Sequence, residues 1–240
     1  MAKSKRTKPI VASVTKSNAT PEKKFNQIEI IRKNCNEFHY SYLVVFINYK
    51  TFTLQQIREA VKPGIMFNGK NRLLQVALGV NAETSYTPNL YKLGANAVNK
   101  TSLILTNKTL EELTSIFNEH HDDIIYAVPG QVSEYDITIT ETQFETANFA
   151  SSLYSYFKNL EMPVKLFDAK LSLLGDLEIC KKGEVLSNKQ CKLLKALQIA
   201  IGTQQIVLKG YYSSDKKDCV IEDLVLSTKS SSSSFIPDVL

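Results

Sequence analysis

Apolar residues in the first half of the chain switch repeatedly between the spacing of helices and the spacing of strands. A helix is predicted from Thr20-Pro21 onward, because a capping threonine and a first-turn proline precede apolar residues at helical spacing. Residues 41–49 are almost continuously apolar, which predicts a buried central strand. Similar patterns predict helices over residues 53–61, 70–78 and 109–120, with capping boxes at Thr53-x-x-Gln56 and Thr109-x-x-Glu112, and strands over residues 65–67 and 102–106. This alternation predicts a three-layer α/β domain.

The pattern changes beyond Pro129-Gly130, where the elements become shorter and more polar. The predicted elements are strands over residues 136–140, 164–167 and 171–174, a helical stripe over residues 149–160, and a helix that begins at the capping box Ser187-x-x-Gln190. Together they predict a small α+β unit over residues 133–201.

A strand predicted over residues 205–212 has no obvious partner inside this unit. If it returns to the first sheet, residues 133–201 form an insertion domain, and the α/β domain consists of residues 20–132 plus residues 202–212. Residues 1–19 show no apolar periodicity and are expected to form an extended arm. Residues 213–240, with a run of serines at 230–234, are expected to form a disordered tail.

Positive charge is concentrated in the arm. The chain has 29 basic and 24 acidic residues, a formal net charge of +5. Residues 1–24 hold seven basic residues and one acidic residue, so this segment carries +6 and the remaining 216 residues carry −1. A basic arm that includes Lys3, Lys5, Arg6 and Lys8 indicates a polyanionic partner, because each neutralised phosphate releases counterions. A solubilising tail or a nuclear import signal would explain the same residues.

Several other classes of protein do not fit the composition. The longest apolar run, residues 42–47, is too short to cross a bilayer, and we expect neither a secretory signal nor a membrane partner. The four cysteines lack C-x-x-C spacing and are expected to be reduced thiols. His120 to Asp123 are predicted to be a solvated helix end, because adjacent helical residues point about 100° apart and do not converge on one metal ion. No cofactor, small-molecule substrate or catalytic triad is indicated.

One segment resembles a nucleotide-binding P-loop. Gly64-x-x-x-x-Gly69-Lys70 matches the pattern as far as the lysine, but Asn71 follows where a magnesium-binding Ser or Thr is required. Residues 65–67 are moreover predicted to be a strand, whereas a phosphate-binding loop needs exposed backbone amides there. A degenerate P-loop nucleotidase therefore remains only an alternative, and we expect that the protein is not an enzyme.

The same turn has the features of an RNA-binding site. Lys70, Asn71 and Arg72 lie at a predicted strand-to-helix turn, where free amides and the helix dipole favour an anion. Arg58 and Lys62 lie one helical turn apart on the preceding helix and are expected to extend the same surface. A glycine-containing turn with solvated charges would explain the same residues without a ligand.

Several segments together resemble the mRNA turnover protein 4 family. They are Lys3-Ser4-Lys5-Arg6, residues 57–62, Gly69-Lys70-Asn71-Arg72 with residues 76–79, residues 103–109 and residues 180–186, and they follow one another at the expected spacing from about residue 3 to 212. Residues 128–131 carry no basic residue where members of the family usually have them, and Ile65 stands where a basic residue is common.

The resemblance implies a nucleolar assembly factor related to the stalk protein of the large ribosomal subunit. Its fold would be an α/β rRNA-binding domain interrupted by an insertion domain. It would occupy the stalk-base rRNA of nuclear pre-60S particles, beside neighbouring ribosomal proteins, until the stalk protein replaces it, and it would pass to the cytoplasm. The alternative is a stalk-type protein of the mature large subunit; against this, the chain ends about 28 residues after the returning strand with a nearly neutral tail.

Overall fold

The computed structural model describes residues 21–167 and 170–231 of the chain. The helices of this part are α1 (Pro21–Glu37), α2 (Thr51–Ala60), α3 (Asn71–Leu78), η2 (Ala82–Thr84), α4 (Tyr91–Ala95), α5 (Leu110–Glu119), α6 (Glu141–Thr146), η3 (Ser151–Leu153), α7 (Tyr154–Asn159) and α8 (Asn188–Ala196). The strands are β1 (Tyr40–Ile47), β2 (Ile65–Phe67), β3 (Thr101–Thr106), β4 (Ile137–Ile139), β5 (Val164–Phe167), β6 (Lys170–Leu173), β7 (Leu177–Cys180), β8 (Thr203–Ser213), β9 (Asp218–Val220) and β10 (Leu224–Ser230). Within the described ranges, no helix has the length and apolar character needed to cross a membrane.

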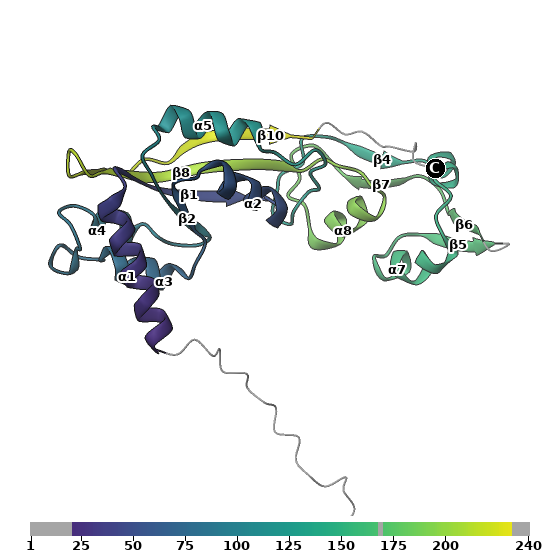
Figure 1. Ribbon diagram of the computed structural model, residues 1–240. Coiled ribbons are helices and arrows are strands. Elements are labelled where there is room, and N and C mark those ends of the chain that lie inside the picture. The colour runs from purple at the N-terminus through teal and green to yellow at the C-terminus, as the bar shows by residue number, and fades with distance from the viewer. Residues whose placement is uncertain (1–20, 168–169, 232–240) are drawn as a thin grey trace, which may run out of the picture.

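The first domain is built around a six-stranded sheet in the order β10-β8-β1-β3-β2, with β9 paired to β8 (Figure 1). All of these pairs are antiparallel. β8 pairs with the whole of β1: Ser213 lies opposite Tyr40 at one end, and Gln205 lies opposite Ile47 at the other. The prediction that a late strand returns to the first sheet is therefore confirmed.

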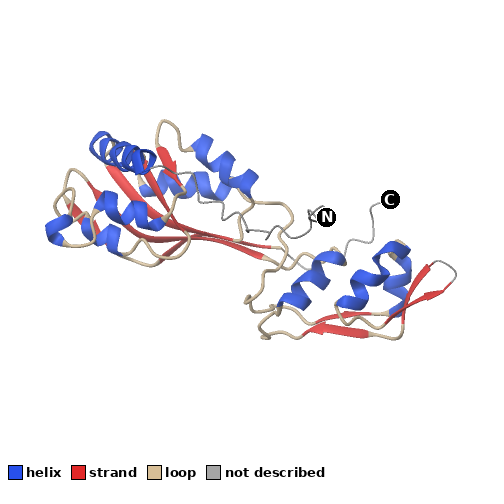
Figure 2. Ribbon diagram, turned by 90° about the horizontal axis from the view of Figure 1, so that it is seen from below, coloured by secondary structure: helices blue, strands red, loops and turns tan. Residues whose placement is uncertain are grey.

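Two separate apolar cores cover the two faces of this sheet. Leu43 of β1 packs with Ile31 of α1 and Leu74 of α3 in one core. Its neighbour Val44 packs with Ile57 of α2 and Phe117 of α5 in the other core, because successive strand residues point to opposite faces. Figure 2 shows helices on both sides of the strands. The three-layer α/β architecture predicted from the sequence is confirmed.

A third core belongs to the second half of the chain. Its buried residues lie between Ala127 and Ile201 and include Phe144, Phe157 and Leu194. They pack between short helices and two two-stranded sheets, β4-β7 and β5-β6. Figure 1 shows this α+β unit beyond the end of the sheet at which β8 begins. Two predicted capping boxes are confirmed: Ser187-x-x-Gln190 caps the start of α8, and Thr109-x-x-Glu112 caps the start of α5.

The disordered tail expected from residue 213 is wrong for residues 213–231. β9 and β10 are both paired with β8, and β10 forms one edge of the six-stranded sheet. Leu226 packs against the core beneath α5, and Ser227 donates a hydrogen bond of 2.7 Å to Asn118. β10 begins with three apolar residues, but it ends in Ser-Thr-Lys-Ser and runs into the serines at 230–234, so the segment resembles a polar tail in the sequence. Residues 232–240 lie outside the described residues.

The predicted capping box at Thr53-x-x-Gln56 is also wrong. α2 begins two residues earlier, after Lys50, which makes no side-chain cap. Thr53 lies within the first turn and is buried, and its hydroxyl donates a hydrogen bond of 2.7 Å to Asp122. The local pattern predicted that the Thr53 hydroxyl caps the helix, but this hydroxyl bonds to the carboxylate of Asp122, which is far away in the sequence.

Candidate nucleic-acid interface

An open groove lies where β1 and β2 end and β3 begins. Its volume is about 1320 Å³, and it is lined by residues 45–49, 54, 68–71, 99–102, 128 and 129. Pockets for small molecules typically measure about 300–1,000 Å³ and enclose most of the ligand. An open groove of this size suits a macromolecular ligand better than a metabolite.

Lys70 stands at one rim of this groove, immediately before α3. It is exposed, its backbone is extended, and its side chain makes no capping bond to the helix. Among the described residues no side chain caps α3, and an uncapped helix start favours an anion through its free backbone N–H groups. Arg72 is exposed in the same turn, and its Nη1 donates a bond of 3.4 Å to Gln75.

Asn71 was expected to bind RNA, but its side chain forms hydrogen bonds within the protein. Its side-chain amide donates to the carbonyl oxygen of Asn99, and its side-chain oxygen accepts a bond of 3.2 Å from Thr101. These bonds fasten the segment before β3 to the start of α3. As a result Lys100, which is exposed, lies at the groove together with Lys70.

Lys100 is a cation of this groove that the sequence reasoning missed. It precedes a predicted strand and has no motif around it. β3 lies between β1 and β2 in the sheet, and this order brings the segment before β3 next to the segment after β2. Within the described residues, no hydrogen bond or ion pair engages the side chain of Lys70 or Lys100.

Arg58 and Lys62 do not extend the surface around Lys70, so this expectation is wrong. Lys62 precedes β2 whereas Lys70 follows it, and α2 and α3 pack on opposite faces of the sheet. Both cations also have neighbours of their own. Lys62 forms an ion pair with Glu59, and Arg58 donates a bond of 3.1 Å to Gln55.

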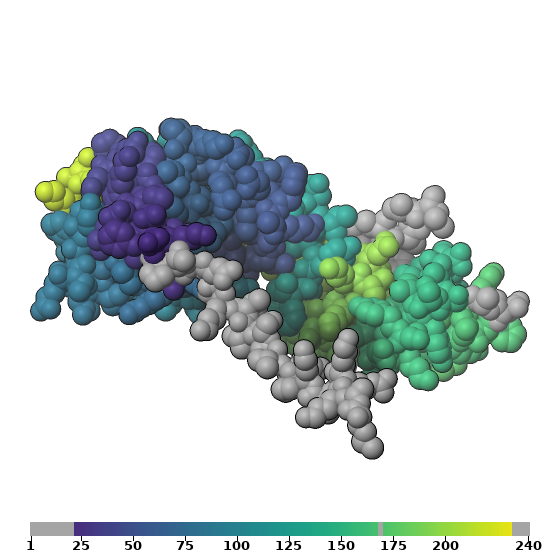
Figure 3. Space-filling model, turned by 60° about the horizontal axis from the view of Figure 1, so that its bottom comes forward, coloured from purple at the N-terminus to yellow at the C-terminus, as the bar shows by residue number. Residues whose placement is uncertain are grey.

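The arm residues predicted to bind RNA, namely Lys3, Lys5, Arg6 and Lys8, lie outside the described residues. The first described element after them is α1, which lies at the surface (purple in Figure 3). α1 packs beside α3, where Arg32 donates bonds of 3.1 Å and 3.2 Å to the carbonyl oxygens of Ala77 and Val76. In the chain, these residues therefore precede a helix that contacts α3 directly.

The near-match to a P-loop folds differently from a phosphate-binding loop. Residues 65–67 form β2, paired with β3 from Ile65 opposite Leu105 to Phe67 opposite Leu103. The prediction that these residues form a strand is confirmed. Since they belong to a sheet, their backbone does not form a loop around a phosphate.

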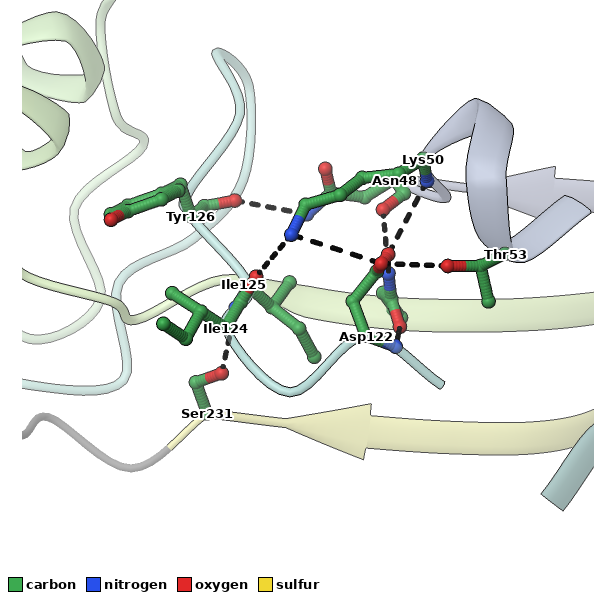
Figure 4. Close-up of polar contacts among 9 residues, drawn as sticks. Asn48, Lys50, Thr53, Asp122, Ile124, Ile125, Tyr126 and Ser231 are labelled. Atoms are coloured by element: carbon green, nitrogen blue, oxygen red, sulfur yellow. Dashed lines mark hydrogen bonds and ion pairs between the residues drawn. The ribbon is translucent and has the colours of Figure 1, made fainter. Parts of the chain in front are cut away.

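Residues 120–123 are not the solvated helix end that the sequence predicts. Asp122 is 7% exposed, and its carboxylate accepts bonds from Thr53 (2.7 Å), from the backbone N–H of Lys50 (3.3 Å) and from Gln204 (Figure 4). The side chain of His121 bonds to Tyr49 and Ser227, each at 2.9 Å. In the described part of the chain, no group of three or more His, Cys, Asp or Glu side chains is placed to hold a metal ion.

The pKa of Asp122 lies below its usual value of 3.8. Burial by itself raises this pKa, but hydrogen bonds from Thr53, Gln204 and the Lys50 backbone stabilise the charged form, and so does the ammonium group of Lys50 at 3.7 Å. The ionised carboxylate therefore joins the end of β1, the start of α2 and the start of β8.

This network also fastens the two connections to the α+β unit. Lys50 Nζ donates a bond of 3.0 Å to the carbonyl oxygen of Ile124, and Asn48 donates a bond of 3.0 Å to the carbonyl oxygen of Tyr126 (Figure 4). Asn48 also donates a bond of 3.1 Å to the carbonyl oxygen of Thr203. Gly202 lies so close to the outgoing segment that an added Cβ would be 2.3 Å from the Tyr126 oxygen. Asn48 also lines the groove, so one wall of the groove is held in place by the domain junction.

Two family models match successive parts of the chain. Residues 19–121 match the model of ribosomal protein L10. Residues 127–199 match the model of the insertion domain in the 60S ribosomal protein of the L10 family. The first range contains three of the six strands of the sheet, β1, β2 and β3, with helices α1 to α5, and the second contains nearly all of the third core.

Curated relatives match over nearly the whole chain. The ribosome assembly factor mrt4 of Dictyostelium discoideum is 27% identical over 90% of this chain and 95% of its own length. The mrt4 proteins of Candida glabrata and Saccharomyces cerevisiae are each 26% identical, over 95% and 90% of this chain and 99% and 95% of their own lengths. The large ribosomal subunit protein uL10 of Caenorhabditis elegans is 23% identical, and the match spans 71% of this chain but 53% of that protein.

Proposed function

Because this chain belongs to the mRNA turnover protein 4 (mrt4) family of ribosome assembly factors, which is related to ribosomal protein L10, we propose that it is an assembly factor of the pre-60S particle. The observation that carries this proposal is the continuous match to mrt4 proteins through both domains. The proposed role is structural: the protein binds large-subunit rRNA and catalyses no reaction.

The RNA surface that we propose is the groove at the ends of β1 and β2. Lys70 and Lys100 supply two cations whose side chains have no protein partner among the described residues, and the start of α3 supplies backbone N–H groups. Positions fixed by secondary structure lose little conformational entropy when they bind phosphates. The arm with Lys3, Lys5, Arg6 and Lys8 would add affinity that depends on salt but not on RNA sequence.

The proposed RNA target is the stalk base of the large subunit. The match to L10 models supports this target, since two proteins that share a binding domain are expected to compete for one RNA site. Such competition would make this protein a placeholder that the stalk protein later replaces. Its proposed location is the nucleolus and nucleus, with passage to the cytoplasm.

Fractionation of ribosomal particles on sucrose gradients tests the proposal. We expect the tagged protein to sediment with nuclear pre-60S particles and to be scarce on polysomes. A stalk-type protein of the mature subunit, the main alternative, would instead be abundant on polysomes. For the RNA target, crosslinking within the purified pre-60S particle is expected to recover stalk-base rRNA, and recovery of another rRNA region would contradict that part of the proposal.

A further inference from the structure

The hairpin of β5 and β6 projects at the far end of the insertion domain (Figures 1 and 3). Its register pairs Val164 with Leu173 and Leu166 with Leu171 on one face. Val164, Leu171 and Leu173 are buried in the core of the domain, so this face points inward.

The opposite face of the hairpin carries an exposed aromatic ring between two cations. Phe167 is 73% exposed and is paired with Lys170, and Lys165 lies two residues before Phe167 on the same face. Both lysines are exposed, and neither forms an ion pair with a carboxylate among the described residues. Asp168 of the turn lies outside the described residues; with its charge included, residues 165–170 still carry one net positive charge.

We propose that this outward face is a second RNA-binding site, on which Phe167 stacks against an unpaired base while Lys165 and Lys170 bind the neighbouring phosphates. Stacking on exposed aromatic rings beside basic residues is the common way in which proteins bind single-stranded RNA without sequence preference. The inference depends on the proposed function only for naming RNA as the partner. It uses no residue of the groove.

An apolar contact with a protein is the competing explanation, and the surroundings of Phe167 argue against it. The core of a protein interface is depleted of lysine. Here Phe167, the most exposed apolar residue of the hairpin, is paired with Lys170. Lys165 lies two positions before Phe167 and is paired with Ser172. Phosphates on both sides of a stacked base would complement these two charges.

Ultraviolet crosslinking of the full-length protein to an oligouridine 12-mer provides the first test. Trypsin cleavage after Lys165 and Lys170 releases residues 166–170 as one peptide, and we expect mass spectrometry to find a uridine adduct on Phe167. The variant Lys70→Ala/Lys100→Ala should keep this adduct even when its binding at the groove is lost. Absence of the adduct in the wild-type protein, or its loss in the groove variant, would overturn the proposal of a separate site.

Substitutions at Phe167 distinguish base stacking from an apolar contact. In the Lys70→Ala/Lys100→Ala background, Phe167→Leu should weaken binding of the 12-mer about tenfold, whereas Phe167→Trp should preserve it. Lys165→Gln/Lys170→Gln should also weaken binding, and the matched control Lys182→Gln/Lys192→Gln, exposed in the same domain, should not. Equal binding by the leucine and tryptophan variants would overturn the stacking model, and failure here would leave the groove proposal untouched.

Discussion

Lys70 with Lys100, and Arg58 with Lys62, are two pairs of cations in the same domain with different surroundings. The first pair lies at an open groove beside the start of α3, which no side chain of the described residues caps. The second pair lies at the other end of β2, where Gln55 and Glu59 already interact with both side chains. Three of the four side chains are exposed and Arg58 is half-buried, yet the two pairs look alike in the sequence.

The difference shows that a cation can bind a ligand only if its side chain is not already engaged by another group of the protein. Lys50 makes the same point, because it also lies near the groove but is directed toward Asp122 and the Ile124 carbonyl oxygen. A lysine with a protein partner contributes to the fold, whereas a lysine without one retains its charge for a ligand.

The largest expected effect is on RNA binding at the groove. Lys70→Ala/Lys100→Ala should weaken binding to a stalk-base rRNA fragment by about 2–4 kcal/mol, because two charge-assisted contacts of about 1–2 kcal/mol each are lost. The slope of log K against log salt should also fall by roughly 1.8, as expected for two lost phosphate contacts. Fluorescence anisotropy at several salt concentrations measures both quantities.

The matched control for this experiment is Arg58→Ala/Lys62→Ala, which removes the same number of charges. We expect the control to change affinity by less than about 0.5 kcal/mol, as for surface charges outside an interface. Equal losses in the two double variants would show that the total charge of the protein, rather than the groove, binds the RNA.

The next effect is on stability, to which Asp122 and its cationic neighbour Lys50 contribute. Asp122→Ala should lower the free energy of unfolding by about 3 kcal/mol, because it leaves the buried hydroxyl of Thr53 without an acceptor and removes one of the two acceptors of Gln204 Nε2. Lys50→Ala should cost only about 1 kcal/mol, since its ammonium group is largely exposed to solvent. Urea denaturation measures both. A large loss of RNA affinity in a folded Lys50→Ala protein would contradict the assignment of Lys50 to the fold.

The smallest expected effect is on the pH dependence of stability. Because the pKa of Asp122 is lowered in the folded protein, its carboxylate adds stability above the unfolded value of 3.8, and this contribution is lost as the pH falls below 3.8 through the folded pKa. Asp122→Asn should be less stable than the wild type near neutral pH, and the difference should shrink toward about pH 2. Urea midpoints between about pH 6 and pH 2 provide the measurement, and a constant difference would contradict it.

The sequence alone determined most helices, most strands and the three-layer architecture. Hydrophobic spacing and local capping act over a few residues, so β1, α3 and the capping box at Thr109 were predictable. The position of Lys70 before α3 followed from the same local pattern. The pattern predicted the α+β unit as well, and the resemblance to a family of assembly factors agreed with its being an insertion domain.

Only the tertiary structure decided which residues share a surface. Strand order placed Lys100 beside Lys70 and separated Lys62 from it, although Lys62 is much closer to Lys70 in the chain. Likewise, the carboxylate of Asp122 lies 69 residues from the hydroxyl of Thr53 in the sequence, and it draws that side chain away from its predicted capping role. β10 ends in Ser-Thr-Lys-Ser, which continues into the serine run, and its pairing with β8 is what distinguishes it from a tail. Sheet pairing and buried hydrogen bonds join residues far apart in the chain, so local patterns did not predict them.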